Sequence, residues 1–171
     1  TVTTATFRVN ALNVKVANLR FVAGTAQLLV KMINVNESHC TFEDCEFVAA
    51  LTATFLVQSF INLATTFDNL IVRRCRFEQG TDPVGTDGGV DSGAFYCVDS
   101  ENILFEDCWF IGLFETAIFH NRTTAVKHLW VKNCIGIQAL SGAEPFQLVA
   151  AATGGCVGGG FITPAPEPKE E

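Results

Sequence analysis

The sequence predicts an all-β solenoid, a chain wound into stacked coils of short strands. The main observation is an octet that recurs along the chain: LNVKVANL from Leu12, CTFEDCEF from Cys40, LIVRRCRF from Leu70, ILFEDCWF from Ile103 and LWVKNCIG from Leu129. The octets start 28, 30, 33 and 26 residues apart, which is a period typical of solenoids with one repeat per coil. Apolar residues occupy the first, third and sixth positions of every octet and the eighth position of all but the last. This is strand-like alternation with one interruption.

The interruption in each octet predicts a corner between two strands. In LIVRRCRF the alternation breaks at Arg73-Arg74 and resumes at Cys75, so a corner there keeps apolar side chains inward on both flanks. Residues that tolerate left-handed backbone recur near the corner or ahead of the strand. They are Asn18, Asp44, Asn69, Asn102, Asp107 and Asn133.

The remaining elements follow in chain order. Thr alternates with apolar residues from Val2 to Val9, which predicts a leading strand or cap over residues 1–11. After each octet a second apolar segment predicts another strand of the same coil, and these segments begin at Ala26, Ala53, Gly93, Thr116 and Pro145. We therefore expect one solenoid domain over residues 12–162, with about five to six coils spaced by about 4.8 Å. The Pro- and Glu-rich residues 163–171 predict a disordered tail.

Four cysteines share one octet position and predict a column in the interior: Cys45, Cys75, Cys108 and Cys134. The eighth position predicts a neighbouring column of Phe47, Phe77 and Phe110. The chain has 7 cysteines and no C-x-x-C pair, so the spacing indicates neither a disulfide framework nor a zinc site. We expect buried free thiols, which would suit assembly in a reducing cytoplasm.

Composition excludes several classes of partner. The chain is 49% hydrophobic and 17% charged, which excludes intrinsic disorder of the whole chain. Its net charge is −7 and it has no basic cluster, so we expect no nucleic-acid partner and no anionic membrane partner. No apolar run approaches the roughly 18 residues of a membrane span.

Charged pairs recur at the predicted corner with alternating sign. Glu43-Asp44 and Glu106-Asp107 flank Arg73-Arg74, and Lys15 and Lys132 lie in the outer octets. Like charges one strand spacing apart would be destabilising, so the alternation indicates a stabilising ladder rather than a catalytic pair of carboxylates.

The segments ENILFEDCWF from Glu101 and DNLIVRRCRF from Asp68 resemble the repeat of the right-handed parallel β-helix superfamily, which includes pectate lyases, polygalacturonases and phage tailspikes. The resemblance covers roughly residues 12–160. It implies a right-handed coil, and for viral members it implies trimers. In enzymes of this fold it also implies carboxylates on the solvent face of a sheet, with Ca²⁺ and Arg in pectate lyases and with His in polygalacturonases.

Two groups of residues are weak candidates for such a site. The Gly-rich insertion from Thr81 to Gly93 contains Asp82, Asp87 and Asp91, whose oxygen atoms suit Ca²⁺, although a solvated loop is the favoured interpretation. His120 and Arg122 follow a predicted strand and could act as base and charge stabiliser, although turn chemistry is favoured. We therefore assign no catalytic residue and expect no cofactor, with Ca²⁺ as the one alternative.

The favoured hypothesis is a non-enzymatic structural or binding protein, a virion or phage surface component such as a decoration, fibre or spike module. It would form a homo-oligomer, with a trimer favoured, or dock onto a virion protein, and it would contact host polysaccharide. Outside a virus it would be secreted. Phe114, Trp109 and Trp130 are expected at the surface in support of self-association. The alternatives are a polysaccharide lyase or glycoside hydrolase, and a carbohydrate-binding module that uses Trp109 or Tyr96.

Overall fold

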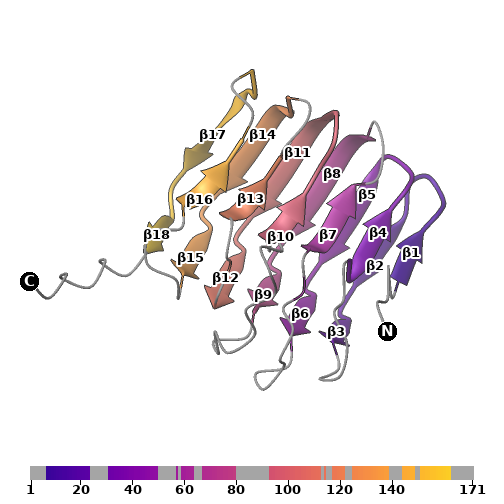
Figure 1. The fold of residues 1–171 in the computed structure, drawn as a ribbon. Coiled ribbons are helices and arrows are strands. Elements are labelled where there is room, and N and C mark those ends of the chain that lie inside the picture. Colours follow the sequence, from indigo (N-terminus) through magenta and orange to yellow (C-terminus); the bar gives the residue numbers. More distant parts are fainter. Residues whose placement is uncertain are drawn as a thin grey trace, which may run out of the picture.

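The computed structural model is an all-β parallel solenoid, which confirms the predicted fold class (Figure 1). It describes residues 7–23, 31–49, 57, 59–63, 67–79, 93–112, 114, 117–121, 125–138, 144–148 and 151–162. In the described residues, three parallel sheets of six strands each run along the solenoid, and the chain visits them in rotation. The solenoid has about four turns between its end coils, so the prediction of five to six coils is slightly too high. Within the described residues, no helix has the length and apolar character that a membrane span needs.

The strands divide evenly among the three sheets. The first sheet contains β1 (Phe7–Val9), β4 (Ile33–Val35), β7 (Ser59–Leu63), β10 (Gly93–Tyr96), β13 (Ala117–His120) and β16 (Glu144–Gln147). The second contains β2 (Lys15–Ala17), β5 (Cys40–Glu43), β8 (Phe67–Arg73), β11 (Ser100–Glu106), β14 (Lys127–Lys132) and β17 (Gly154–Val157). The third contains β3 (Arg20–Ala23), β6 (Glu46–Ala49), β9 (Arg76–Glu78), β12 (Trp109–Gly112), β15 (Ile135–Gln138) and β18 (Gly160–Ile162).

Each octet forms a strand of the second sheet, a corner and the start of a strand of the third sheet. The octets from Cys40, Leu70, Ile103 and Leu129 pair in the predicted alignment. The first octet is an exception, because Lys15 pairs with Thr41 and the repeat therefore starts at Val14 instead of Leu12. The shift replaces Leu12 and Ala17 by Val16 and Phe21 at the inward positions, and since all four are apolar, the alternation alone did not reveal it. The second apolar segments supply β4, β7, β10, β13 and β16 of the first sheet.

Aromatic side chains fill the interior along the solenoid axis. Phe47 stacks on Phe77 with ring centroids 4.6 Å apart, and Phe77 stacks on Phe110 at 4.9 Å. The column then reaches Gly136, which pairs with both Phe110 and Phe161. A Cβ on Gly136 would lie 2.3 Å from Phe161 Cδ1, so only glycine leaves room for the Phe161 ring. Phe114, which we expected at the surface, is instead fully buried beside Phe60, so that prediction is wrong.

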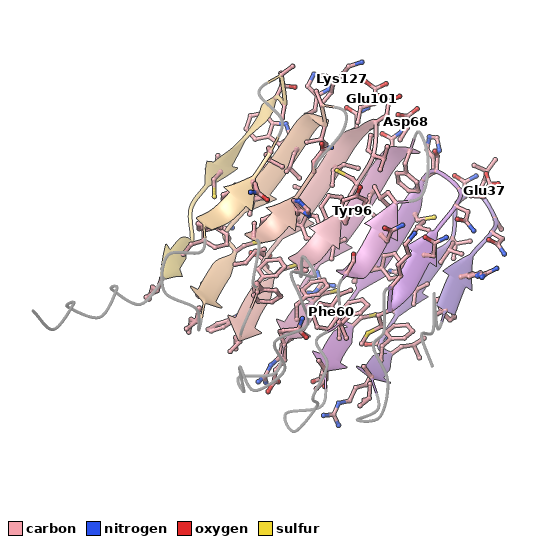
Figure 2. The ribbon with its side chains drawn as sticks, viewed as in Figure 1. Glu37, Phe60, Asp68, Tyr96, Glu101 and Lys127 are labelled. Carbon is pink, nitrogen blue, oxygen red and sulfur yellow. The ribbon has the colours of Figure 1, made fainter. Side chains whose placement is uncertain are left out.

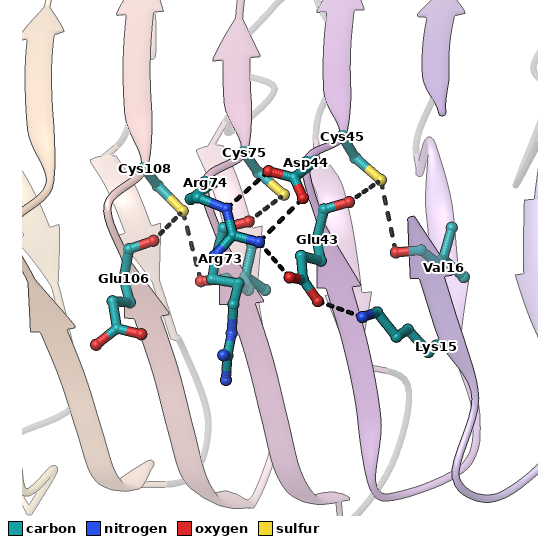
Figure 3. Close-up of polar contacts among 11 residues, drawn as sticks. Lys15, Val16, Glu43, Asp44, Cys45, Arg73, Arg74, Cys75, Glu106 and Cys108 are labelled. Atoms are coloured by element: carbon teal, nitrogen blue, oxygen red, sulfur yellow. Dashed lines mark hydrogen bonds and ion pairs between the residues drawn. The ribbon is translucent and has the colours of Figure 1, made fainter. Parts of the chain in front are cut away.

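The cysteine column has a polar function at the corner. Each of the four thiols donates a hydrogen bond, at 3.3 Å, to the carbonyl oxygen two residues earlier in the chain, and Figure 3 shows this for Cys45, Cys75 and Cys108. The pairs are Cys45 with Glu43, Cys75 with Arg73, Cys108 with Glu106, and Cys134 with Lys132. All four cysteines are buried and free. A residue here must be small, apolar and still able to donate a weak hydrogen bond, and cysteine meets all three requirements.

The backbone turns each corner through left-handed residues. All six Asn and Asp residues singled out in the sequence have positive φ, which confirms that expectation. In the described residues, five further non-glycine residues also have positive φ: Asn13, His39, Arg74, Asp99 and His128. Left-handed backbone is most unusual for Arg74, which hydrogen bonds with the neighbouring coil stabilise. Asn69 Nδ2 lies 3.2 Å from His39 Nε2, and His128 Nδ1 lies 3.1 Å from Asn102 Oδ1.

Candidate functional site

The corner between the second and third sheets carries the ion pairs of the predicted ladder. Arg74 Nε donates to Asp44 Oδ1 at 2.8 Å and Arg74 Nη2 donates to Asp44 Oδ2 at 3.0 Å, which is a bidentate pair (Figure 3). Arg74 also contacts Glu43, whose other oxygen lies 2.5 Å from Lys15 Nζ. Lys15 and Arg74 lower the pKa of Glu43 by hydrogen bonding, and Arg74 likewise lowers that of Asp44.

The ladder does not continue through the later coils. Glu106, Asp107 and Lys132 make no ion pair with any other residue in the described ranges. The pairing therefore ties the first three coils together and stops there. Glu43 and Asp44 are therefore both paired with cations of neighbouring coils, and these pairs stabilise the stacking of the first three coils. Glu106 and Asp107, at the same corner of a later coil, have no such pairing among the described residues.

The outward face of the third sheet changes character along the solenoid. In the first three coils it carries Arg20, Glu46, Arg76 and Glu78, beside Val22 and Val48. Arg20 Nε lies 3.1 Å from Glu46 Oε2, and Arg76 Nη2 lies 2.9 Å from Glu78 Oε2. In the last three coils the same positions are apolar. We call these side chains the apolar half of the third sheet: Trp109, Ile111, Ile135, Ile137 and Ile162.

Strand register makes the apolar half continuous. Trp109 pairs with Ile135, and Ile111 pairs with Ile137, which pairs with Ile162. Paired side chains on one face lie about 5 Å apart and touch. Trp109 is 47% exposed, Ile137 is 42% exposed and Ile162 is 64% exposed. The result is one contiguous apolar strip instead of scattered apolar residues, and such strips mark interaction sites.

A groove lies where the apolar half meets the charged corner. It encloses about 480 Å³ and is lined by Arg74, Cys75, Arg76, Asp107, Trp109 and Ile111. Trp130, on the outward face of the second sheet, is also exposed, as expected. The exposed aromatic and aliphatic side chains thus belong mainly to the later coils.

The outward face of the first sheet carries a continuous polar row. Register places Arg8, Asn34, Asn62, Tyr96, His120 and Gln147 side by side on successive strands. Asn62 Nδ2 donates to Asn34 Oδ1 at 2.7 Å, and Asn34 Nδ2 donates to Asn36 Oδ1 at 2.6 Å. Tyr96, labelled in Figure 2, is half-buried in the middle of the row. We call this set the polar row.

His120 is the member of the polar row with unused hydrogen-bonding capacity. It ends β13, as the sequence predicted, and only 4% of it is exposed. Its ring centroid lies 5.5 Å from that of Tyr96, and its buried Nε2 has no hydrogen-bond partner among the described residues. Burial lowers the pKa of His120, so the imidazole is neutral near pH 7.

Most of the candidate catalytic and metal-binding residues lie outside the described residues: Asp82, Asp87, Asp91 and Arg122. His120 is the only one that the structure places. Within the described ranges, no group of three or more His, Cys, Asp or Glu side chains is arranged to hold a metal ion.

Sequence reasoning overlooked both the polar row and the apolar half. The polar row comes from the second apolar segments, where each outward residue was hidden among apolar neighbours. The apolar half was visible in part, since the seventh octet position reads Glu46, Arg76, Trp109 and Ile135 in successive repeats. Aligning the outward positions as well as the inward ones would have revealed the change from charged to apolar residues along the repeats.

The fold and these surfaces define a parallel β-solenoid whose third sheet has an apolar half and whose first sheet carries the polar row. No family model, curated protein or solved structure matches the chain.

Proposed function

We propose that this chain is a non-enzymatic structural and binding protein that assembles with itself or docks onto a larger shell. In this proposal it is a right-handed β-helix of the pectate-lyase-like and tailspike-like kind. Its place is the surface of a virion or phage, as a decoration, fibre or spike module. The observation that carries the proposal is the apolar half of the third sheet, a contiguous strip of exposed Trp and Ile side chains.

The apolar half has the character of an interface core. Interface cores are enriched in aromatic side chains and depleted of charge, and a buried Trp commonly contributes much of the binding energy. The strands beneath Trp109 and Ile137 are hydrogen-bonded on both sides, so these side chains are held on a rigid surface and lose little backbone freedom on binding. Charged neighbours in the first three coils keep the rest of this face hydrated.

The proposed partners follow from this face and from the resemblance. A second copy of the chain is the first, with a trimer as the favoured state, and a virion protein is the second. Burial raises the pKa of Cys45, and raises that of Cys97 to about 11, so these thiols stay protonated and unreactive. Buried free thiols suit a protein that folds in a reducing cytoplasm before release on a virion.

The accessible members of the polar row support contact with host polysaccharide. Asn62 and His120 are buried, but the amide groups of Asn34 and Gln147 and the phenol group of Tyr96 are at least partly exposed on strands of one sheet. Such groups donate and accept hydrogen bonds without charge, which suits the hydroxyl groups of sugars, and the ring of Tyr96 offers an apolar surface beside them.

Light scattering tests the assembly proposal directly. The purified chain should form an oligomer whose mass does not change when Ca²⁺ is added or chelated. Ile137→Lys should dissociate it, because a charge at the centre of the apolar half cannot be desolvated without a partner. Thr41→Lys, on the outward face of the second sheet, is the matched control and should leave the mass unchanged. A chain that is monomeric at every concentration would exclude this function.

A second candidate, a lyase or hydrolase of acidic polysaccharide, is favoured by one observation. His120 is a neutral imidazole whose Nε2 has no partner in the part of the chain that the structure describes, and general bases need these properties. Turnover of a polyuronate or another acidic polysaccharide that is lost in His120→Gln would support this candidate. If turnover were lost in Asp87→Ala, or if turnover required Ca²⁺, the Gly-rich insertion that contains Asp82, Asp87 and Asp91 would be part of the active site. Binding without turnover would favour the binding protein.

A further inference from the structure

The two ends of the solenoid are edges of all three sheets at once. β1, β2 and β3 form the edge strands at one end, and β16, β17 and β18 form those at the other (Figure 1). Inside the molecule every strand pairs in parallel with the coil before it and the coil after it. Among the described residues no strand pairs with the outer side of an end coil, so its backbone N–H and C=O groups have the arrangement that another parallel coil would complete.

The C-terminal end also exposes the interior of the solenoid. Cys156 occupies the inward column of Phe105 and Val131, which are fully buried, yet Cys156 is exposed. All four residues of β17 are exposed. A hollow of about 250 Å³ opens at this end and is lined mainly by apolar side chains. Its lining is Leu129, Phe146, Leu148, Ala152, Thr153, Gly154, Gly155 and Cys156.

The N-terminal end exposes the opposite ends of the same columns. Phe21 begins the aromatic column that Phe161 ends, and both rings are only partly buried. Val22 begins the outward row that Ile162 ends, and these two side chains are 57% and 64% exposed. An apolar residue at one end thus has an apolar counterpart in the same column at the other end. Joining the ends would bury the apolar side chains of both ends, and each apolar column would continue into the next copy.

Charge and strand direction both favour joining opposite ends. Residues 7–23 contain Arg8, Lys15 and Arg20 and no acidic residue, whereas Glu144 is the one ionisable carboxylate or amine of residues 133–162. Two N-terminal ends would bring the cations of both copies together, which is unfavourable, although Lys15 and Arg20 each have an acidic partner in the second coil. Two identical ends related by a two-fold axis would also meet with antiparallel strands, whereas contact of opposite ends keeps the parallel pairing of every sheet in the molecule.

We propose that copies of this chain stack head to tail, with β16, β17 and β18 of one copy pairing in parallel with β1, β2 and β3 of the next. The internal register fixes the partners. Gly155 lies opposite Lys15 of the next copy, Cys156 opposite Val16, Phe161 opposite Phe21, and Ile162 opposite Val22. This inference rests on the proposed self-assembly and specifies one of its contacts, the contact between the ends of two copies.

Such a contact joins two different surfaces and does not close on itself. Each added copy offers a new free end, so the stack grows with protein concentration instead of stopping at a fixed number. The apolar half lies on the side of the solenoid, so a lateral contact through it leaves the ends free. A trimer formed on the sides would therefore stack in steps of three copies.

Disulfide trapping in the full chain tests the register. In a Cys156→Ser background, the pair Val22→Cys and Ile162→Cys places two thiols on adjacent parallel strands of neighbouring copies. Their Cα atoms would be about 4.8 Å apart, within the usual range for a disulfide. Both positions are exposed, so folding is not at risk. Mild oxidation should give a ladder of dimers, trimers and larger species on a non-reducing gel.

The matched control moves one thiol out of register. Arg20→Cys with Ile162→Cys has two exposed thiols, but position 20 lies opposite Gly160 of the next copy. This control should give about tenfold less ladder, because a two-residue offset exceeds the distance that a disulfide spans. Equal ladders from both pairs would overturn the head-to-tail register.

If light scattering shows an oligomer but neither pair gives a ladder, the stacking inference fails while the proposed function stands. If the chain is a monomer with no ladder, both fail.

Discussion

Arg74 and Asp44 hold left-handed backbone at the same corner of successive coils, and Arg74 Nε donates to Asp44 Oδ1 at 2.8 Å across that corner. The bidentate pair and the added contact with Glu43 offset the unfavourable backbone of an arginine with φ of 50°. An interaction between coils thus offsets the unfavourable backbone conformation of Arg74. Because this interaction needs ionised carboxylates, its contribution to stability depends on pH.

Stability should fall on acidification, and Arg74 should be part of the reason. The pKa of both Glu43 and Asp44 is lowered in the folded chain, so their contribution is fully present above the unfolded pKa values of about 4. It is lost as pH falls through the folded values. Urea unfolding followed by circular dichroism between pH 6 and about 3 should therefore show a smaller decline for Arg74→Gln than for the parent. Arg8→Gln is the control, and a decline in Arg74→Gln equal to that of the parent would contradict the account.

Replacing a thiol of the cysteine column should show how strictly its place is specified. Cys75 is buried and its thiol donates to the carbonyl of Arg73, so Cys75→Asp would bury an unpaired carboxyl group. We expect a loss of several kcal/mol of unfolding free energy, or no folding. Cys75→Ser retains a donor and should cost less. Cys156→Asp, at the exposed thiol, should stay within about 0.5 kcal/mol of the parent. A soluble Cys75→Asp of parental stability would show that the column is not interior.

Gly136→Ala should loosen the last coil specifically. The new Cβ would lie 2.3 Å from Phe161 Cδ1 and 2.9 Å from Ile118 Cδ1, so the Phe161 ring would have to move. Overpacking of this kind costs about 1–3 kcal/mol. Hydrogen exchange should quicken in β15 and β18 while the first coils keep their protection. Gly160→Ala is the matched control, because its Cβ would meet nothing within 4 Å. Equal exchange in both variants would refute the packing explanation.

His120 should titrate below the ordinary histidine pKa of about 6.5. Burial disfavours the charged ring, and the structure gives its Nε2 no partner that would stabilise a proton. Because the folded pKa is depressed, folding is weakened as pH falls below the unfolded value. Proton NMR of the imidazole resonances, assigned by their loss in His120→Gln, measures this directly. A value above 6.5 would require a carboxylate partner for the ring.

The alternation predicted most of the fold because inward positions leave a clear signal. The octets, their corners and the left-handed Asn and Asp residues could all be read from the sequence. The left-handed backbone of Arg74 could not, since arginine has no preference for it and hydrogen bonds with the neighbouring coil stabilise it. That of His39 and His128 was overlooked, although histidine adopts it more often than most residues. The first octet was misplaced by two residues because Leu12 is apolar yet exposed. Phe114 was misplaced for the converse reason, since burial beside Phe60 depends on contacts outside the repeat.

The surfaces were harder to predict than the core. Inward positions must be apolar in every coil. Outward positions vary from coil to coil, and a surface patch is recognised only when the residues of neighbouring strands are aligned. Asn62 and Tyr96 lie 34 positions apart in the numbering, and their relation is evident only once β7 and β10 are paired. The polar row therefore emerges from register, which sequence periodicity alone does not supply for segments separated by long insertions.

The thiols of the cysteine column can also report the order in which the coils unfold. Its four thiols belong to four consecutive coils, and each becomes available to an alkylating reagent only when its own coil opens. A brief pulse of reagent during unfolding, followed by peptide mass spectrometry, would date the opening of each coil separately. Labelling that advances from Cys134 towards Cys45 would mean that the solenoid unwinds from its C-terminal end, and the reverse order would mean that it unwinds from the other.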